Sequence, residues 1–175
     1  MNNEQHIDIA DSESEQLVVF RLANEFYGVD IGAVNTIIRM QEITAIPRTP
    51  DFVEGVINLR GSIVPVIDLR KRFGLPIGEI TKASRIVVVE AGQQMIGMIV
   101  DAVAETLRLP SSAIEPPSPV VTSLDTEYLR GVGKLEDRMV ILLDLEKVLS
   151  NSEVESLAKL DKKLNKSQGE EKKAA

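Results

Sequence analysis

Short apolar runs that end in polar turns recur along this chain, and they have the length and the β-branched content of β-strands. The run LVVFRL ends at the turn 23–25 and is followed by EFYGVDI, a pattern that predicts a β-hairpin. The run IVVVEA, the turn 92–94 and MIGMIV repeat this pattern further along the chain.

Two more strands are expected where GVINL and IVPVIDL flank a turn that contains Arg60. Gly61 can adopt the positive φ that such a tight turn requires. Pro65 has no N–H to donate, so we expect it at a sheet edge or at a β-bulge. Asp68 is a suitable N-cap for the short helix LRKRF, and Gly74 is a suitable residue to end it.

These patterns indicate an internal duplication. A shift of 69 residues brings LVVF onto IVVV, and a shift of 76 residues brings residues 52–73 onto residues 128–149 without a gap. Seven of those 22 positions are identical. Two matching stretches in the same order are the mark of repeated structural units.

Each repeat offers about five strands and one helical turn, with repeat one at about 15–82 and repeat two at about 83–150. Closure into a small barrel removes the exposed sheet edges that so many short strands would otherwise leave. The predicted fold is therefore all-β, with two packed five-stranded barrels. Exchange of strands between the barrels stays open at this point.

The two ends differ from the repeats. Residues 1–14 carry four acids and no base, and we expect this stretch and residues 166–175 to be disordered tails. The pattern of residues 151–165 predicts an amphipathic helix, with apolar side chains at Val154, Leu157, Leu160 and Leu164. We expect this helix to dock on a barrel, and binding of a partner is the alternative.

Composition removes several classes of function. The chain has 175 residues, a net charge of −7, no Cys, and one His at position 6. Thiol chemistry, disulfides, and histidine-based catalysis or metal binding within the fold are therefore excluded. Aromatic residues make up 3% of the chain, which with the acidic balance argues against nucleic-acid binding. No apolar run approaches the roughly 18 residues of a membrane span, so we expect a cytoplasmic protein.

The remaining polar candidates lie at turns. Four carboxylates, Asp30, Asp68, Asp101 and Asp144, stand near strand or helix ends, where we interpret them as caps and turn acceptors. A hydrolase with paired carboxylates is the alternative, and nothing in their spacing supports it. Arg60 is expected to be exposed at its turn, either as an ordinary surface residue or as an anchor in a protein interface.

Several motifs resemble the CheW family of bacterial chemotaxis coupling proteins. They are EFYGVDI, TPDFVEGVINLRGSIVPVIDLRKRFG, GMIVDAV and DTEYLRGVGKLEDRMVILLDLEKVL, in this order between about Glu15 and Ser150. The resemblance implies two SH3-like barrels, no catalysis and no cofactor or metal. It implies a cytoplasmic adaptor that joins the tips of chemoreceptors to the regulatory domain of the kinase CheA within membrane-associated arrays, without entering the membrane or binding nucleic acid.

The same resemblance assigns residues to surfaces. The receptor-binding residues would be Ile31, Val34, Arg60 and Val103. The kinase-binding residues would be Gly55 and Val56, and the ring contacts to a second kinase domain would be Glu115 and Val120. This chain departs from the family at Thr36, where many relatives carry Glu, and at Val120, where relatives often carry an aromatic residue.

Other functions stay open on the sequence. A scaffold of the same fold in another receptor–kinase pathway would look the same, because the identity of the partner is not encoded in the adaptor. An enzyme would require a polar, concave site with perturbed carboxylates, whereas an adaptor predicts a seam lined by Val, Ile and Leu.

Overall fold

The computed structural model describes residues 13–91, 93–117 and 128–149, and within these ranges the strands form two sheets. The six-stranded sheet has the order β8-β1-β2-β11-β10-β9. Its strands are β1 (Ser14–Leu22), β2 (Glu25–Asp30), β8 (Ala102–Pro110), β9 (Ile114–Glu115), β10 (Leu129–Lys134) and β11 (Met139–Leu143). The expected tails and the expected helix at 151–165 lie outside the described residues, except that β1 already begins at Ser14.

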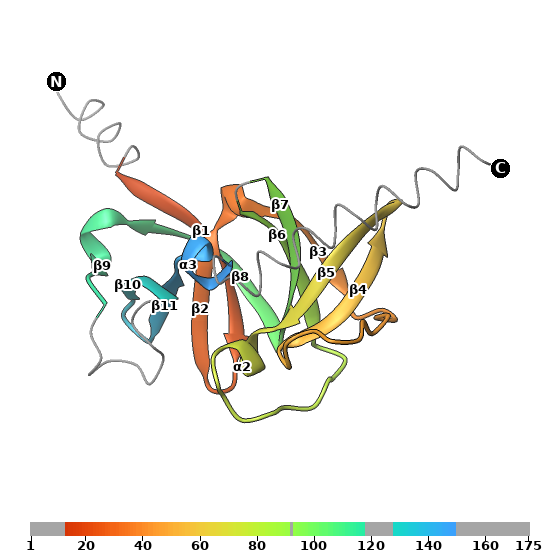
Figure 1. Ribbon diagram of the computed structural model, residues 1–175. Helices are drawn as coiled ribbons and strands as arrows, with labels where there is room; N and C mark the ends of the chain where they lie inside the picture. The colour runs from red at the N-terminus through yellow and green to blue at the C-terminus, as the bar shows by residue number, and fades with distance from the viewer. Residues whose placement is uncertain (1–12, 92, 118–127, 150–175) are drawn as a thin grey trace, which may run out of the picture.

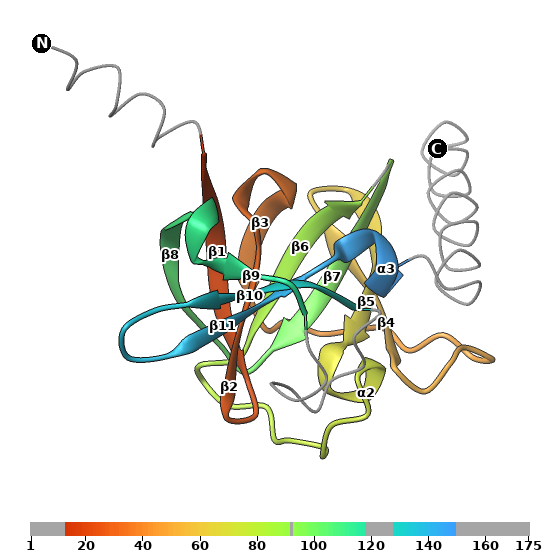
Figure 2. The same ribbon diagram turned by 90° about the vertical axis from the view of Figure 1, so that its left-hand side faces the viewer.

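The five-stranded sheet has the order β3-β6-β7-β5-β4 and packs beside the first sheet (Figures 1 and 2). Its strands are β3 (Val34–Arg39), β4 (Val53–Leu59), β5 (Ser62–Asp68), β6 (Arg85–Ala91) and β7 (Gln94–Val100). Short helices connect or follow the strands: η1 (Ile31–Ala33), α2 (Leu69–Arg72), η2 (Ser111–Ala113) and α3 (Leu145–Leu149).

The structure confirms the repeat, because equivalent sequences form equivalent elements. The 69-residue shift relates β1, β2 and β3 to β6, β7 and β8, and the 76-residue shift relates β4, β5 and α2 to β10, β11 and α3. The sixth strand of the larger sheet is the two-residue β9, which pairs with β10 at Val132. Its counterpart in the five-stranded sheet is the single bridge between Thr44 and Val56.

Strands are exchanged between the repeats. The β1–β2 hairpin of repeat one lies in the sheet of repeat two, through a parallel pairing that includes Tyr27 and Ile141. The β6–β7 hairpin of repeat two lies in the sheet of repeat one, through a parallel pairing that includes Val66 and Gly97. Neither repeat can therefore complete its own sheet from its own residues.

The exchanged strands are buried on both faces, which explains their unbroken apolar runs. In β1, Leu17 and Val19 face the interior of the six-stranded sheet, whereas Val18, Phe20 and Leu22 face the seam between the two sheets. Among the described residues, the seam cluster contains 19 buried side chains, against 6 and 5 in the interiors of the five- and six-stranded barrels. The main hydrophobic core thus lies between the barrels rather than inside either one.

Aromatic residues gather at one end of this seam. The rings of Phe20, Tyr27, Phe73 and Tyr128 follow one another with centroids 6.1, 6.1 and 5.4 Å apart. The guanidinium of Arg72 lies 4.9 Å from the centre of the Phe52 ring and 5.2 Å from that of Tyr128. Its Nε also donates a hydrogen bond to the Val148 carbonyl at 3.2 Å, so α2 of repeat one is tied to α3 of repeat two.

Pro65 corrects one prediction, because β5 is an inner strand rather than an edge strand. The N–H and the carbonyl of Val56, which is opposite Pro65, both bond Thr44 at 2.9 Å and so point away from β5. The Pro65 nitrogen therefore faces away from β4, and pairing of β5 with β7 begins only at Val66. The missing N–H costs no ladder hydrogen bond at this position.

The backbone at position 55 adopts a conformation, and allows a close approach, that require glycine. Gly55 has φ +143°, and a Cβ at this position would lie 2.1 Å from the Thr44 carbonyl oxygen. The equivalent Gly131 makes the same close approach to the Glu115 carbonyl oxygen, at 2.8 Å from an added Cβ. Because the glycine has no Cβ, the segment that contains Thr44 or Glu115 can cross closely over the strand that contains the glycine and close the barrel.

An ion pair with hydrogen bonds joins the two repeats on the side of α2. Arg70 Nε donates to Asp101 Oδ1 at 2.9 Å, and Arg70 Nη2 donates to Asp101 Oδ2. Asp101 Oδ2 also accepts the Ala23 N–H at 2.9 Å. Burial alone raises the pKa of Asp101, but the hydrogen bonds from Arg70 and Ala23 outweigh it and lower this pKa below its ordinary value of 3.8.

We predict that Gly55→Ala destabilises the protein by about 3 kcal/mol, because the new Cβ meets backbone and the residue keeps a left-handed φ. The matched control is Gly74→Ala, where φ is +70° and an added Cβ meets nothing within 4 Å. The control should lose only about 1 kcal/mol. Urea unfolding followed by circular dichroism measures both, and equal losses would contradict the close-approach explanation.

We predict that Asp101→Asn destabilises the protein by about 2 kcal/mol at pH 7, because Arg70 loses a charged acceptor. The folded pKa of Asp101 is depressed, so this stabilisation is present above the unfolded pKa and is lost as the pH falls through the folded pKa. The stability difference between wild type and variant should therefore shrink below about pH 4.

The control for this prediction is Glu115→Gln. Its ion pair with Lys134 at 3.1 Å joins side chains that are 55% and 54% exposed, so the loss should stay below about 0.5 kcal/mol. A difference in unfolding free energy between Asp101→Asn and wild type that does not change with pH would contradict the ion-pair account.

Candidate functional site

Three half-buried apolar residues stand where the seam reaches the surface. Ile31, Val34 and Val103 all pack against the seam cluster without being buried by it. Val34 and Val103 are equivalent under the 69-residue shift, so each repeat contributes the same position to this rim. The sequence resemblance assigned all three residues to receptor binding, and all three pack against the same seam cluster, as do Ala33, Phe73, Leu75 and Tyr128.

Local structure explains how these residues are positioned. Asp30 caps η1 by accepting the Gly32 N–H at 3.0 Å, which places Ile31 at the start of a short turn rather than in a strand. Val34 then begins β3 opposite Val89, just before a shift of register. Val103 lies opposite Phe20, next to an irregularity in the pairing of β1 with β8.

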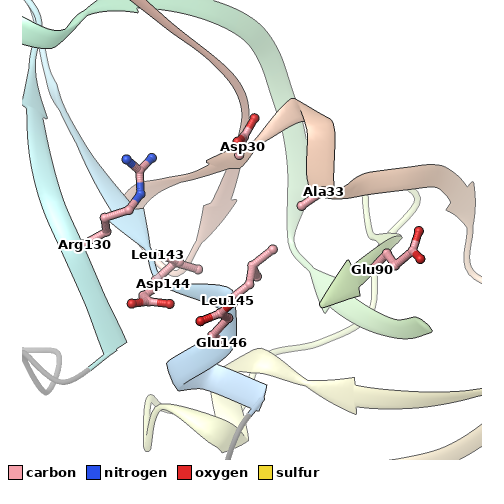
Figure 3. Close-up of a pocket in the computed structure, with 8 residues that line it drawn as sticks. All are labelled: Asp30, Ala33, Glu90, Arg130, Leu143, Asp144, Leu145 and Glu146. Atoms are coloured by element: carbon pink, nitrogen blue, oxygen red, sulfur yellow. The ribbon is translucent and has the colours of Figure 1, made fainter. Parts of the chain in front are cut away.

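A small pocket of about 210 Å³ opens beside η1 (Figure 3). Its apolar residues are Ala33, Leu143 and Leu145, and its charged residues are Asp30, Glu90, Arg130, Asp144 and Glu146. Arg130 Nη1 lies 2.7 Å from Glu15 Oε1, and this hydrogen-bonded pair raises the pKa of the guanidinium. The surroundings of the rim are thus acidic, apart from one arginine whose charge is already paired.

Arg60 lies in the turn at the tip of the β4–β5 hairpin, whose two strands are labelled in Figure 1. Arg60 and Gly61 have φ of 53° and 87°, and Asn58 Oδ1 accepts the Gly61 N–H at 2.9 Å. The predicted positive φ at Gly61 is thus confirmed. The Arg60 side chain is exposed and is not part of the rim formed by the other three assigned residues.

The two residues assigned to the kinase surface differ in what they can offer. Gly55 is buried and acts through the backbone, so it presents no side chain to a partner. Val56 is half-buried and lines a shallow pocket of about 420 Å³ with Gln41, Glu42, Thr44, Ile57, Asn58 and Ile63.

Of the two residues assigned to ring contacts, only Glu115 is among the residues that the structure describes. Glu115 lies in β9 and pairs with Lys134 at 3.1 Å. Val120 lies outside the described residues.

The four carboxylates that the sequence suggested as caps are engaged as expected. Asp30 caps η1, Asp68 accepts the N–H groups of Arg70 and Lys71, and Asp144 accepts the Lys147 N–H at 3.3 Å. Asp101 is held by Arg70 and the Ala23 N–H. Burial raises the pKa of Asp68 more than its two backbone hydrogen bonds lower it.

Neither a metal centre nor a membrane span is found in the described part of the chain. No group of three or more His, Asp or Glu side chains there is arranged to hold a metal ion. None of the helices there has the length and the apolar character needed to cross a bilayer. The two sheets with their shared apolar seam define the class of the protein as an all-β protein of two packed barrels.

Comparison with known proteins identifies the family. The CheW-like domain family matches residues 16–153, and the chain belongs to this family. It is 42% identical to the chemotaxis protein CheW of Klebsiella aerogenes over 140 residues, which cover 80% of this chain and 84% of that protein. It is 34% identical to the chemotaxis protein CheW of Bacillus subtilis over 143 residues, which cover 81% and 91%.

A solved structure agrees with this assignment. The crystal structure of the scaffolding protein TtCheW from Thermoanaerobacter tengcongensis superposes with a TM-score of 0.72 at 47% identity, and the match covers 77% of this chain and 87% of that one. The all-β, two-barrel fold predicted from the sequence is therefore confirmed.

Proposed function

We propose that this chain is a non-catalytic adaptor that couples the cytoplasmic tips of chemoreceptors to the histidine kinase CheA. Membership of the CheW-like family supports the chemotaxis role, and the scaffolding neighbour supports the adaptor role. The observation that carries the proposal is the rim, where equivalent valines of the two repeats and Ile31 offer apolar side chains beside an otherwise polar surface.

A receptor tip of helical-hairpin form suits this rim. An amphipathic helix binds by placing apolar side chains, spaced three or four residues apart, into an apolar groove. Ile31, Val34 and Val103 are half-buried, so they are held in place by the seam and still offer contact area. Little conformational entropy should be lost when such pre-positioned side chains are covered.

Arg60 would act at the edge of this contact. An exposed arginine can form two parallel hydrogen bonds with a carboxylate of the receptor, and it also speeds association by electrostatic attraction. Many relatives carry Glu at the position of Thr36 in β3, so this chain would lack one charged contact to a partner there.

The kinase surface is assigned to the first repeat near Gly55 and Val56, in β4. Val56 and the residues around it form a shallow apolar and polar surface along β4, and Gly55 sets its shape by admitting Thr44. Contacts that close a ring with a second CheA regulatory domain are assigned to Glu115 and Val120. The protein would act in the cytoplasm and be recruited to membrane-associated arrays through its partners, without inserting into the membrane.

Absence of catalysis fits the chemistry of the described residues. The seam is lined by apolar side chains, and the candidate carboxylates serve as caps or ion-pair partners. A CheW-like scaffold of another receptor–kinase pathway is the second candidate, and the genes that surround its coding sequence would separate the two.

We predict that Arg60→Ala weakens receptor binding by about 2 kcal/mol, because an interface arginine of this type is commonly an anchor. Binding of the CheA regulatory domain should be unchanged. The matched control is Arg48→Ala, since Arg48 is also exposed and also has a positive φ, at 63°. Calorimetric titration with a receptor tip measures the effect, and equal receptor affinity in both variants and wild type would sink the assignment of Arg60.

A further inference from the structure

A third pocket, at the end of β3 opposite to Val34, is rich in positive charge. It has a volume of about 410 Å³ and is lined by Arg39, Met40, Thr81, Lys82, Ser84 and Arg85. Three of these six residues are cationic and none is acidic. The pocket forms where β3 ends and β6 begins, after the loop that leads from α2 to β6.

The pairing of strands forces two of the charges together. Arg39 and Arg85 are direct partners in the antiparallel pairing of β3 with β6. Like charges at directly opposed positions destabilise a sheet. In the described part of the chain, no carboxylate pairs with Arg39, Lys82 or Arg85, so no described residue offsets this repulsion through an ion pair.

The pocket is also pre-formed by its turn. Thr81 N–H donates to Ser84 Oγ at 2.9 Å, Ser84 N–H donates to the Thr81 carbonyl at 3.1 Å, and Ala83 N–H donates to Thr81 Oγ1 at 3.1 Å. Ser84 is only 3% exposed, and among the described residues it is the one polar residue classed with the core.

Arg85 is held in this turn rather than extended into solvent. Its Nη1 donates to the carbonyls of Lys82 and Ser84, both at 2.8 Å. One edge of the guanidinium is thus fixed by the turn, and its remaining N–H groups are available for a ligand. A cation that is held in place beside two others cannot move away to relieve the repulsion.

We propose that this pocket binds a phosphate-class dianion, either free phosphate or a phosphate group carried on a protein side chain. Guanidinium groups match the geometry of phosphate oxygens with paired hydrogen bonds, and an ammonium adds a point charge. A dianion also balances more of the three positive charges than a single carboxylate can. The proposal does not rest on the coupling function.

Amide NMR spectra of the full chain test this proposal. Inorganic phosphate is titrated at constant ionic strength against sodium chloride, and a short peptide with one phosphoserine is titrated against its unphosphorylated form. Saturable shifts at residues 39 and 81–85 are expected with at least one phosphate source. The source that saturates the signal identifies whether the natural ligand is free or protein-bound.

Variants make the result specific. Arg39→Gln and Lys82→Gln remove exposed side chains and should each weaken phosphate binding about tenfold. Arg48→Gln, which removes an exposed charge elsewhere, should leave it unchanged. In phosphate-free, low-salt buffer Arg39→Gln should raise the melting temperature, because the opposed charges are relieved.

Two outcomes overturn the proposal. The first is that inorganic phosphate shifts the amide signals no more than sodium chloride does, and that the phosphoserine peptide shifts them no more than its unphosphorylated form does. The other is undiminished phosphate affinity in both Arg39→Gln and Lys82→Gln while their spectra remain those of a folded protein.

Discussion

Strands β1 and β6 must bury both of their faces. One face of each strand is directed to the seam, with Val18 and Phe20 on β1 and Val87 and Val89 on β6, and the neighbouring residues in the sequence face the barrel interiors. These strands are therefore apolar at consecutive positions and have no face that can remain in water. Each barrel interior holds few buried side chains, so most of the apolar area removed from water lies between the barrels. Exchange of the two hairpins ties this core to both sheets, and the two repeats depend on one another for completion.

The seam also determines where the protein can offer surfaces. Ile31, Val34 and Val103 rest on its rim, so a partner that contacts them contacts the end of the main core rather than a loose loop. Hairpin tips and short strands extend from the same framework and carry Arg60 and Val56. An adaptor with two surfaces needs such stiffness, because displacement of one partner must change the position of the other.

The sequence predicted much of this fold because its signals are local or repeated. The runs at 17–20 and 86–89, the turn at Gly61 and the cap at Asp68 each depend on a few adjacent residues. The sequence left strand exchange open and did not predict the inner position of Pro65, since both depend on which distant strands pair. The cationic pocket was missed for the same reason, because only the register of β3 on β6 brings Arg39 to Arg85. The residues of the candidate site were assigned from the family resemblance. The structure adds that Gly55 is needed for a close approach of the backbone at Thr44, and that Val34 and Val103 occupy equivalent positions in the two repeats.

The central claim is that the seam makes the two barrels one cooperative unit, and native-state hydrogen exchange tests it most directly. Slowly exchanging amides of β1 and β11 in the six-stranded sheet and of β6 and β5 in the five-stranded sheet would be followed at increasing urea concentration. The account predicts that all four strands converge on one opening free energy, equal to that of global unfolding. Two separate free energies, one for each sheet, would contradict it and would show that each barrel is stable without the other.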